Sequence, residues 1–179
     1  VDKLQQESEG RKVSNYGGWQ SEAQDLIAQK PIAVEVLLQG IQTSLNQCTK
    51  MAGLPTLQIS DYWFNVNPKG SYNQPHNHRD SLLSGVYYID ATPEQGRIQF
   101  YRDDDAEYFM PRLPKYTQIT SQKATYNPAP HKILIFPSWV KHSVEGNPTD
   151  NTRISMSFNT MIAMTPENDE IAKLNGLQQ

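Results

Sequence analysis

Residues 133–159, ILIFPSWVKHSVEGNPTDNTRISMSFN, contain the pattern on which the interpretation of the whole chain depends. An apolar run ends at Pro137, a histidine follows at position 142, and a second run begins at residue 152, beyond the turn signal Gly146-Asn147-Pro148. In the second run polar residues alternate with largely apolar ones: Arg153, Ser155, Ser157 and Asn159 against Ile154, Met156, Phe158 and Thr160. Because successive side chains of a strand point to opposite faces, the pattern predicts a strand over 152–162 with one polar face.

Arg153 lies on the polar face of this predicted strand, and Ser155 follows it on the same face. A guanidinium in the interior of a sandwich or barrel is costly unless an anion meets it. Its planar fork matches a carboxylate with two parallel hydrogen bonds, and a hydroxyl two residues further on can add a third. The pair therefore indicates a site for a ligand with a distal carboxylate. The alternative is a strand whose polar face lies in solvent.

The rest of the chain is predicted to form helices first and strands afterwards. Apolar residues at helical spacing over 34–48 predict a helix between Pro31 and Gly53, and Ser21 is expected to cap a shorter helix before it. Strand-like runs rich in β-branched and aromatic residues cover 57–66, 82–89, 97–101 and 132–136. This order favours the α+β class, with the strands closed into a sandwich or barrel.

Histidines supply the candidate metal site. His78 and Asp80, two residues apart in an extended segment, would point to the same side and present an imidazole nitrogen and a carboxylate oxygen. His142 is the expected third ligand of a 2-His-1-carboxylate triad, which binds iron(II) and leaves positions for a chelating cosubstrate and for O₂. A 2-oxo acid with a distal carboxylate, 2-oxoglutarate, would satisfy both the metal and the Arg153-x-Ser155 pair.

The order His78-x-Asp80, His142, Arg153-x-Ser155 resembles the superfamily of oxygenases that depend on iron(II) and 2-oxoglutarate. The segments YWFNVNPKGSYNQPHNH (62–78), LLSGVYYI (82–89) and 133–159 are similar to a small bacterial and phage family of oxygenases related to prolyl hydroxylases. The resemblance implies a double-stranded β-helix (jelly-roll) core that uses iron(II), 2-oxoglutarate and O₂ to hydroxylate a substrate, with release of succinate and CO₂.

The resemblance also implies roles for individual residues. Iron would be bound by His78, Asp80 and His142, and the C5 carboxylate of 2-oxoglutarate by Arg153 and Ser155. Tyr88 lies in a segment similar to the prolyl hydroxylase strand whose tyrosine bonds the 2-oxoglutarate carboxylate. The family shares the motif H-x-H, here His76-Asn77-His78, so His76 is either an alternate ligand or a residue just behind the ligands.

Length and composition set the remaining expectations. The 179 residues fit a single domain, with a helical support over 1–55, the jelly-roll catalytic core over 56–163 and a polar tail over 164–179. A net charge of −3 with scattered basic residues argues against nucleic-acid binding, and no apolar run is long enough to cross a membrane. The single cysteine and the lack of a signal-peptide pattern favour a cytoplasmic protein. The segment 102–131, rich in proline and tyrosine, is expected to be a lid over the iron.

Two other classes of protein fit part of the pattern. His76-x-His78 and Pro137-x-Trp139-x-x-His142 loosely fit the motifs of a metal-binding cupin that does not use 2-oxoglutarate. The first cupin motif has a glutamate where leucines stand at 82 and 83, and a cupin of this kind has no role for Arg153. A non-catalytic jelly roll would leave the histidines unexplained. Neither the substrate, a peptide or a small molecule, nor the oligomeric state is specified by the sequence.

Overall fold

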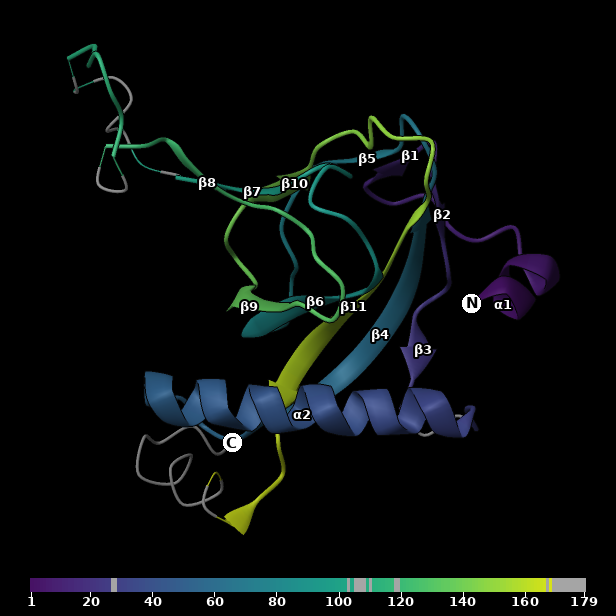
Figure 1. The fold of residues 1–179 in the computed structure, drawn as a ribbon. Coiled ribbons are helices and arrows are strands. Elements are labelled where there is room, and N and C mark those ends of the chain that lie inside the picture. Colours follow the sequence, from purple (N-terminus) through teal and green to yellow (C-terminus); the bar gives the residue numbers. More distant parts are fainter. Residues whose placement is uncertain are drawn as a thin grey trace.

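The computed structural model describes residues 1–26, 29–102, 104, 109, 111–117, 120–166 and 168. Two β-sheets face each other, and one long helix runs along the outside of the larger sheet (Figure 1). The helices are α1 (Asp2–Glu7) and α2 (Ile32–Ala52). The strands are β1 (Asn15–Tyr16), β2 (Trp19–Gln20), β3 (Gln24–Asp25), β4 (Leu57–Asn67), β5 (Tyr72–His76), β6 (Leu83–Asp90), β7 (Ile98–Tyr101), β8 (Lys123–Tyr126), β9 (Ile133–Pro137), β10 (His142–Val144) and β11 (Arg153–Ile162).

The two sheets are built by strands that alternate along the chain. The larger sheet has the order β2-β4-β11-β6-β9, with β3 also paired to β4, and the smaller sheet has the order β1-β5-β10-β7-β8. From β4 onward the chain passes repeatedly from one sheet to the other, and the strand pairs are antiparallel. This arrangement is a jelly roll, so the fold class predicted from the sequence is confirmed. Among the described helices, none is long and apolar enough to span a membrane.

Strand β11 lies at the centre of the larger sheet, between β4 and β6. Met156 and Phe158 on one face are fully buried, in the core that the sheet shares with α2. The helix contributes Leu38, Ile41 and Leu45 to this core. On the opposite face Arg153, Ser155, Ser157 and Asn159 line a cavity between the two sheets. The predicted alternation is therefore present up to Asn159, where a bulge shifts the register against β4.

The five strands predicted from the sequence are confirmed to within one residue at each end. The helix predicted after Ser21 is wrong. The backbone nitrogen of Ser21 donates to Phe64 O at 2.9 Å, and its Oγ accepts a hydrogen bond from Phe64 N at 3.0 Å. The hydroxyl expected to cap a helix thus ties the chain to β4, and Gln24 and Asp25 continue as β3. Residues 1–55 therefore supply three short strands as well as helices, and most of the expected tail 164–179 lies outside the described residues.

Gly85 allows β6 to pass under the ring of Phe158 on β11. A Cβ at this position would lie 2.6 Å from Phe158 Cε1 and 2.7 Å from the backbone oxygen of Leu134. Gly85→Ala is therefore expected to lower the free energy of unfolding by about 1–3 kcal/mol through overpacking, as measured by urea denaturation. The control is Gly40→Ala in α2, where an added Cβ meets nothing within 4 Å. It should raise stability by up to about 1 kcal/mol, and equal effects of the two changes would contradict this account.

Candidate metal and cosubstrate site

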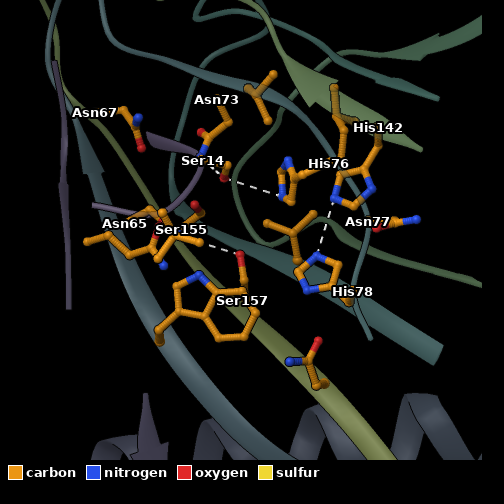
Figure 2. A pocket seen from close by; sticks show the side chains of 18 of the residues that line it. Ser14, Asn65, Asn67, Asn73, His76, Asn77, His78, His142, Ser155 and Ser157 are labelled. Carbon is orange, nitrogen blue, oxygen red and sulfur yellow. Dashed lines mark hydrogen bonds between the residues drawn. The ribbon is translucent and has the colours of Figure 1, made fainter. Parts of the chain in front are cut away.

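Three histidines gather in the cavity between the sheets (Figure 2). His76, His78 and His142 each present a ring nitrogen, and these atoms all lie within 4.8 Å of one another. The ring centroids of His76 and His142 are 4.3 Å apart, and those of His78 and His142 are 5.2 Å apart. Imidazole nitrogens at this spacing can bind one transition-metal ion, and iron is among the metals that imidazole suits.

Strand pairing brings these histidines together. His76 is the last residue of β5 and His142 is the first of β10, and the two are direct partners in the antiparallel register. His78 lies just beyond β5, and its backbone nitrogen donates to Ser138 O at 2.9 Å, in the turn before β10. Ser138 is fully buried, and its hydroxyl shares a 2.8 Å hydrogen bond with Ser84 Oγ of β6. The segment that holds His78 is therefore itself held in place.

Backbone carbonyl groups orient two of the three rings. His76 Nδ1 lies 2.7 Å from Gln74 O, and His142 Nδ1 lies 2.9 Å from Val140 O. Because a carbonyl oxygen can only accept, both Nδ1 atoms carry the hydrogen, and both Nε2 atoms of the neutral rings are left as acceptors. His142 Nε2 faces His78 Nε2 at 3.3 Å. A hydrogen on His78 Nε2 can bridge this gap in the metal-free protein, and a bound cation can replace it.

Burial keeps the three rings uncharged at neutral pH. It lowers the pKa of His78 to about 4, with a smaller contribution from the neighbouring His76. It also lowers the pKa of His142 to about 4, against the opposing effect of the bond to Val140. The pKa of His76 is lowered by burial as well, although the bond to Gln74 raises it. The neutral imidazole is the form that binds a metal ion, so these rings need not lose a proton to do so.

Asp80 does not join the histidine cluster. Its side chain is exposed and does not line the cavity, and its φ of 57° lies in the left-handed region. The expectation that His78 and Asp80 point to the same side assumed an extended chain, but β5 ends at His76 and the backbone bends at residues 79 and 80. The rule that residues i and i+2 share a side holds only within a strand. The structure instead places His76, the alternate ligand, beside His78 and His142.

A buried cation lines the same cavity as the histidines. Arg153 is 2% exposed, and its Nη1 donates to Gln95 O at 2.6 Å and to Gly96 O at 2.9 Å. Within the part of the chain that the structure describes, no carboxylate pairs with Arg153. Burial lowers its pKa, against the opposing effect of Tyr88, but a guanidinium stays charged in proteins. A buried charge without an anion is costly, so this end of the cavity is suited to an anionic ligand.

Tyr88 and Ser155 provide two hydroxyl groups on the same sheet as Arg153. Ser155 pairs with Tyr88 of β6 on one side and with Asn65 of β4 on the other, and all three line the cavity. Tyr88 is 2% exposed, and burial raises its pKa to about 12 although Arg153 lowers it. The phenol therefore keeps its hydrogen and can donate it to a carboxylate. The structure thus brings six of the residues singled out in the sequence into one cavity: His76, His78, His142, Tyr88, Arg153 and Ser155.

The N-terminal segment forms part of the wall of this cavity, whose volume is about 320 Å³. Arg11, Ser14 and Gln20 line it, and they reach it because β1 pairs with β5 and β2 pairs with β4. The sequence analysis missed these residues because they belong to no motif and lie in a polar lead-in. The segment 102–131, expected to be a lid, contributes no lining residue in its described part, while residues 103, 105–108, 110, 118 and 119 lie outside the description.

The fold and the site are of the kind expected for oxygenases that use iron(II) and 2-oxoglutarate, and comparison with known families agrees. The family described as "Putative 2OG-Fe(II) oxygenase" matches residues 61–159, which is more than half of the chain. The chain therefore belongs to this family, and membership implies iron(II) as cofactor and 2-oxoglutarate as cosubstrate. No curated protein matches the sequence.

Several solved structures share the fold. An oxidoreductase of the 2OG-Fe(II) oxygenase family from Burkholderia pseudomallei is 16% identical, with a TM-score of 0.56 over 75% of this chain and 58% of that one. A Pseudomonas putida prolyl-4-hydroxylase is 17% identical, with a TM-score of 0.54 over 82% and 73%. The alpha ketoglutarate dependent epimerase SnoN from nogalamycin biosynthesis is 18% identical, with a TM-score of 0.55 over 74% and 57%. The chain thus spans less than two thirds of the first and third proteins, and the likeness concerns the fold.

The residues present fit both the metal and the cosubstrate that the family implies. The histidine cluster is a set of neutral nitrogen donors of the kind that iron accepts. The buried Arg153, with no carboxylate partner among the described residues, has the charge and the fork geometry for the C5 carboxylate of 2-oxoglutarate. A cupin that does not use 2-oxoglutarate would leave this guanidinium without an anion, and that alternative is not favoured.

Proposed function

We propose that this oxygenase is a hydroxylase whose iron(II) is bound by three histidines. The metal ligands are His76, His78 and His142, and the residues that hold 2-oxoglutarate are Arg153, Ser155 and Tyr88. The proposal rests above all on one observation: a buried guanidinium without a carboxylate partner in the described chain lines the same cavity as a cluster of neutral imidazoles. A metal site alone would not need the guanidinium, and an anion site alone would not need the imidazoles.

The residues of the chain bind and orient iron(II) and 2-oxoglutarate, and they exclude water from the site. Iron(II), when bound, supplies the reaction with dioxygen in which a substrate C–H bond is oxidised while 2-oxoglutarate is converted into succinate and CO₂. Arg153 holds the far end of 2-oxoglutarate, and the carbonyl groups of Gln74 and Val140 keep two Nε2 atoms directed at the metal. Phe136 packs against His142 with ring centroids 4.8 Å apart and keeps bulk water from that side of the site.

The substrate is proposed to bind beside Trp63, on the side of the histidines where the cavity is lined by charged residues. The indole ring lies 5.7 Å from the ring of His78, and the guanidinium of Arg11 lies 5.5 Å from the indole centroid. Asp61, two residues earlier on β4, lines the same part of the sheet face. A cavity of about 320 Å³ that also holds 2-oxoglutarate leaves space for a small metabolite or for one side chain of a peptide.

The proposed hydroxylation is tested with isotopically labelled dioxygen. Protein reconstituted with iron(II) is incubated with 2-oxoglutarate and a panel of free amino acids and proline-containing peptides, and the products are analysed by mass spectrometry. One labelled oxygen atom is expected in succinate and one in the oxidised substrate, in equal amounts. Labelled succinate together with an oxidised product that carries no label would retain the oxygenase and reject the hydroxylase. No labelled succinate with any substrate would reject the proposed activity.

A further inference from the structure

The N-terminal segment is held against the metal site by both sheets. Asn15 and Tyr16 of β1 pair with Asn73 and Tyr72 of β5, and the backbone nitrogen of Gln74 donates to Ser14 O at 2.8 Å. A few residues later β2 pairs with β4 in the larger sheet. Figure 2 shows the result, with the Ser14 side chain between Asn73 and the ring of His76. The polar N-terminal segment thus places the Ser14 hydroxyl beside the histidine cluster.

The direction of each hydrogen bond around Ser14 follows from the groups present. His76 Nδ1 donates to Gln74 O, so His76 Nε2 is an acceptor in the neutral ring. Asn73 Nδ2 can only donate, and it lies 3.1 Å from Ser14 Oγ. The Ser14 hydroxyl therefore accepts from Asn73 and directs its own hydrogen toward His76 Nε2, 3.4 Å away. The same nitrogen atom is the one that His76 would use to bind the metal.

A metal ion bound to His76 would take the lone pair that the Ser14 hydroxyl now faces. Asn73 would still hold the oxygen of Ser14 in place, and the hydroxyl hydrogen would need a new acceptor beside His76. No other described side chain accepts a hydrogen bond from Ser14. A partly buried donor without an acceptor is costly, so the new acceptor should belong to the ligand that shares the cavity.

We propose that Ser14 is a positioning residue for 2-oxoglutarate: once the metal is bound, its hydroxyl donates to the C1 carboxylate, the end of the molecule that chelates the metal beside His76. This inference rests on the proposed function, because it needs 2-oxoglutarate to bind in this cavity. The inference gives the C1 and C5 carboxylates of 2-oxoglutarate separate partners in the protein. Arg153 of β11 holds the C5 carboxylate, and the N-terminal segment, which lies outside the match to the family, holds the C1 carboxylate.

The test is calorimetric titration of the full chain without oxygen, first with Mn(II) and then with 2-oxoglutarate. Ser14→Ala is expected to raise the dissociation constant of 2-oxoglutarate roughly 10- to 100-fold, as for loss of a hydrogen bond to a charged group. The affinity for Mn(II) should stay the same or rise slightly, because the hydroxyl no longer competes for His76 Nε2. Ser14→Thr keeps the hydroxyl and should restore most of the affinity for 2-oxoglutarate.

Ser8→Ala is the matched control, since Ser8 lies in the same segment, its hydroxyl accepts a hydrogen bond from the backbone nitrogen of Gly10, and it does not line the cavity. It should change neither affinity. If Ser14→Ala leaves 2-oxoglutarate binding unchanged, or weakens Mn(II) and 2-oxoglutarate binding together, the inference is wrong, and in the second case Ser14 merely supports His76. If wild-type protein binds Mn(II) but no 2-oxoglutarate, the proposed function fails together with the inference about Ser14. The behaviour of the wild type therefore distinguishes failure of the proposed function from failure of the inference alone. Thermal unfolding of each metal-free variant checks that the fold is retained.

Discussion

Arg153→Ala is expected to raise the dissociation constant of 2-oxoglutarate by a factor of about 10² to 10³, because removing one partner of a buried charge pair typically costs about 3–5 kcal/mol. Arg153 is 2% exposed and lines the cavity, and among the described residues the carbonyls of Gln95 and Gly96 bond its Nη1. Its other nitrogens make no hydrogen bond to a described residue, so they can form a two-pronged contact with the C5 carboxylate. The affinity for Mn(II) should be nearly unchanged, since the proposed metal ligands lie on β5 and β10 or just beyond β5, and not on β11.

Arg153→Lys separates the geometry of the contact from its charge. An ammonium group retains the charge but cannot form two parallel bonds, so the lysine variant should recover only part of the affinity. Arg97→Ala is the matched control, because Arg97 is a surface arginine paired with Glu145. It should leave 2-oxoglutarate binding intact. The measurement is titration of 2-oxoglutarate into Mn(II)-loaded protein without oxygen, and full affinity in Arg153→Ala would remove the proposed C5 carboxylate site.

His76→Ala is expected to weaken Mn(II) or iron(II) binding by more than about 100-fold, because replacing a residue that only orients a ligand already costs roughly 10- to 100-fold. One of its ring nitrogens belongs to the cluster in which the nitrogen atoms lie within 4.8 Å of one another. Asp80→Ala should leave the metal affinity nearly unchanged, since Asp80 is exposed and lies outside the cavity lining. This reverses the expectation from the sequence alone, which assigned Asp80 to the metal and kept His76 as the alternate.

A histidine outside the cluster provides the control for these two variants. His131→Ala serves as the control, because His131 is exposed and its Nδ1 shares a hydrogen bond with the Tyr87 hydroxyl at 2.8 Å. It should bind the metal as the wild type does. Metal content after anaerobic reconstitution, together with titration, measures all three variants. Loss of the metal in Asp80→Ala with retention in His76→Ala would restore the 2-His-1-carboxylate triad and would reject the three-histidine site.

The strands that carry the proposed cosubstrate residues could be recognised from the sequence because their pattern is local. Alternation along 152–162 predicted that Arg153 and Ser155 share a face, and the structure places both in the cavity. Side-chain direction within a strand depends only on the backbone repeat, which the residue types reveal. Tyr88 was singled out by the resemblance instead, on a strand that the sequence shows clearly, and the structure places it in the same cavity. A buried guanidinium also needs an anion to offset the cost of burying its charge, so an anionic partner could be inferred before any fold was known.

Only the tertiary structure decided which third group accompanies His78 and His142, and which segment closes the site. The H-x-H-x-D pattern permits two ligand pairs, and the choice depends on where β5 ends, which pairing with β1 and β10 determines. Ser14 belongs to no motif, and it reaches His76 only because β1 pairs with β5. The ends and partners of short strands depend on contacts between residues far apart in the chain, whereas a sequence pattern records only the conformation within a strand.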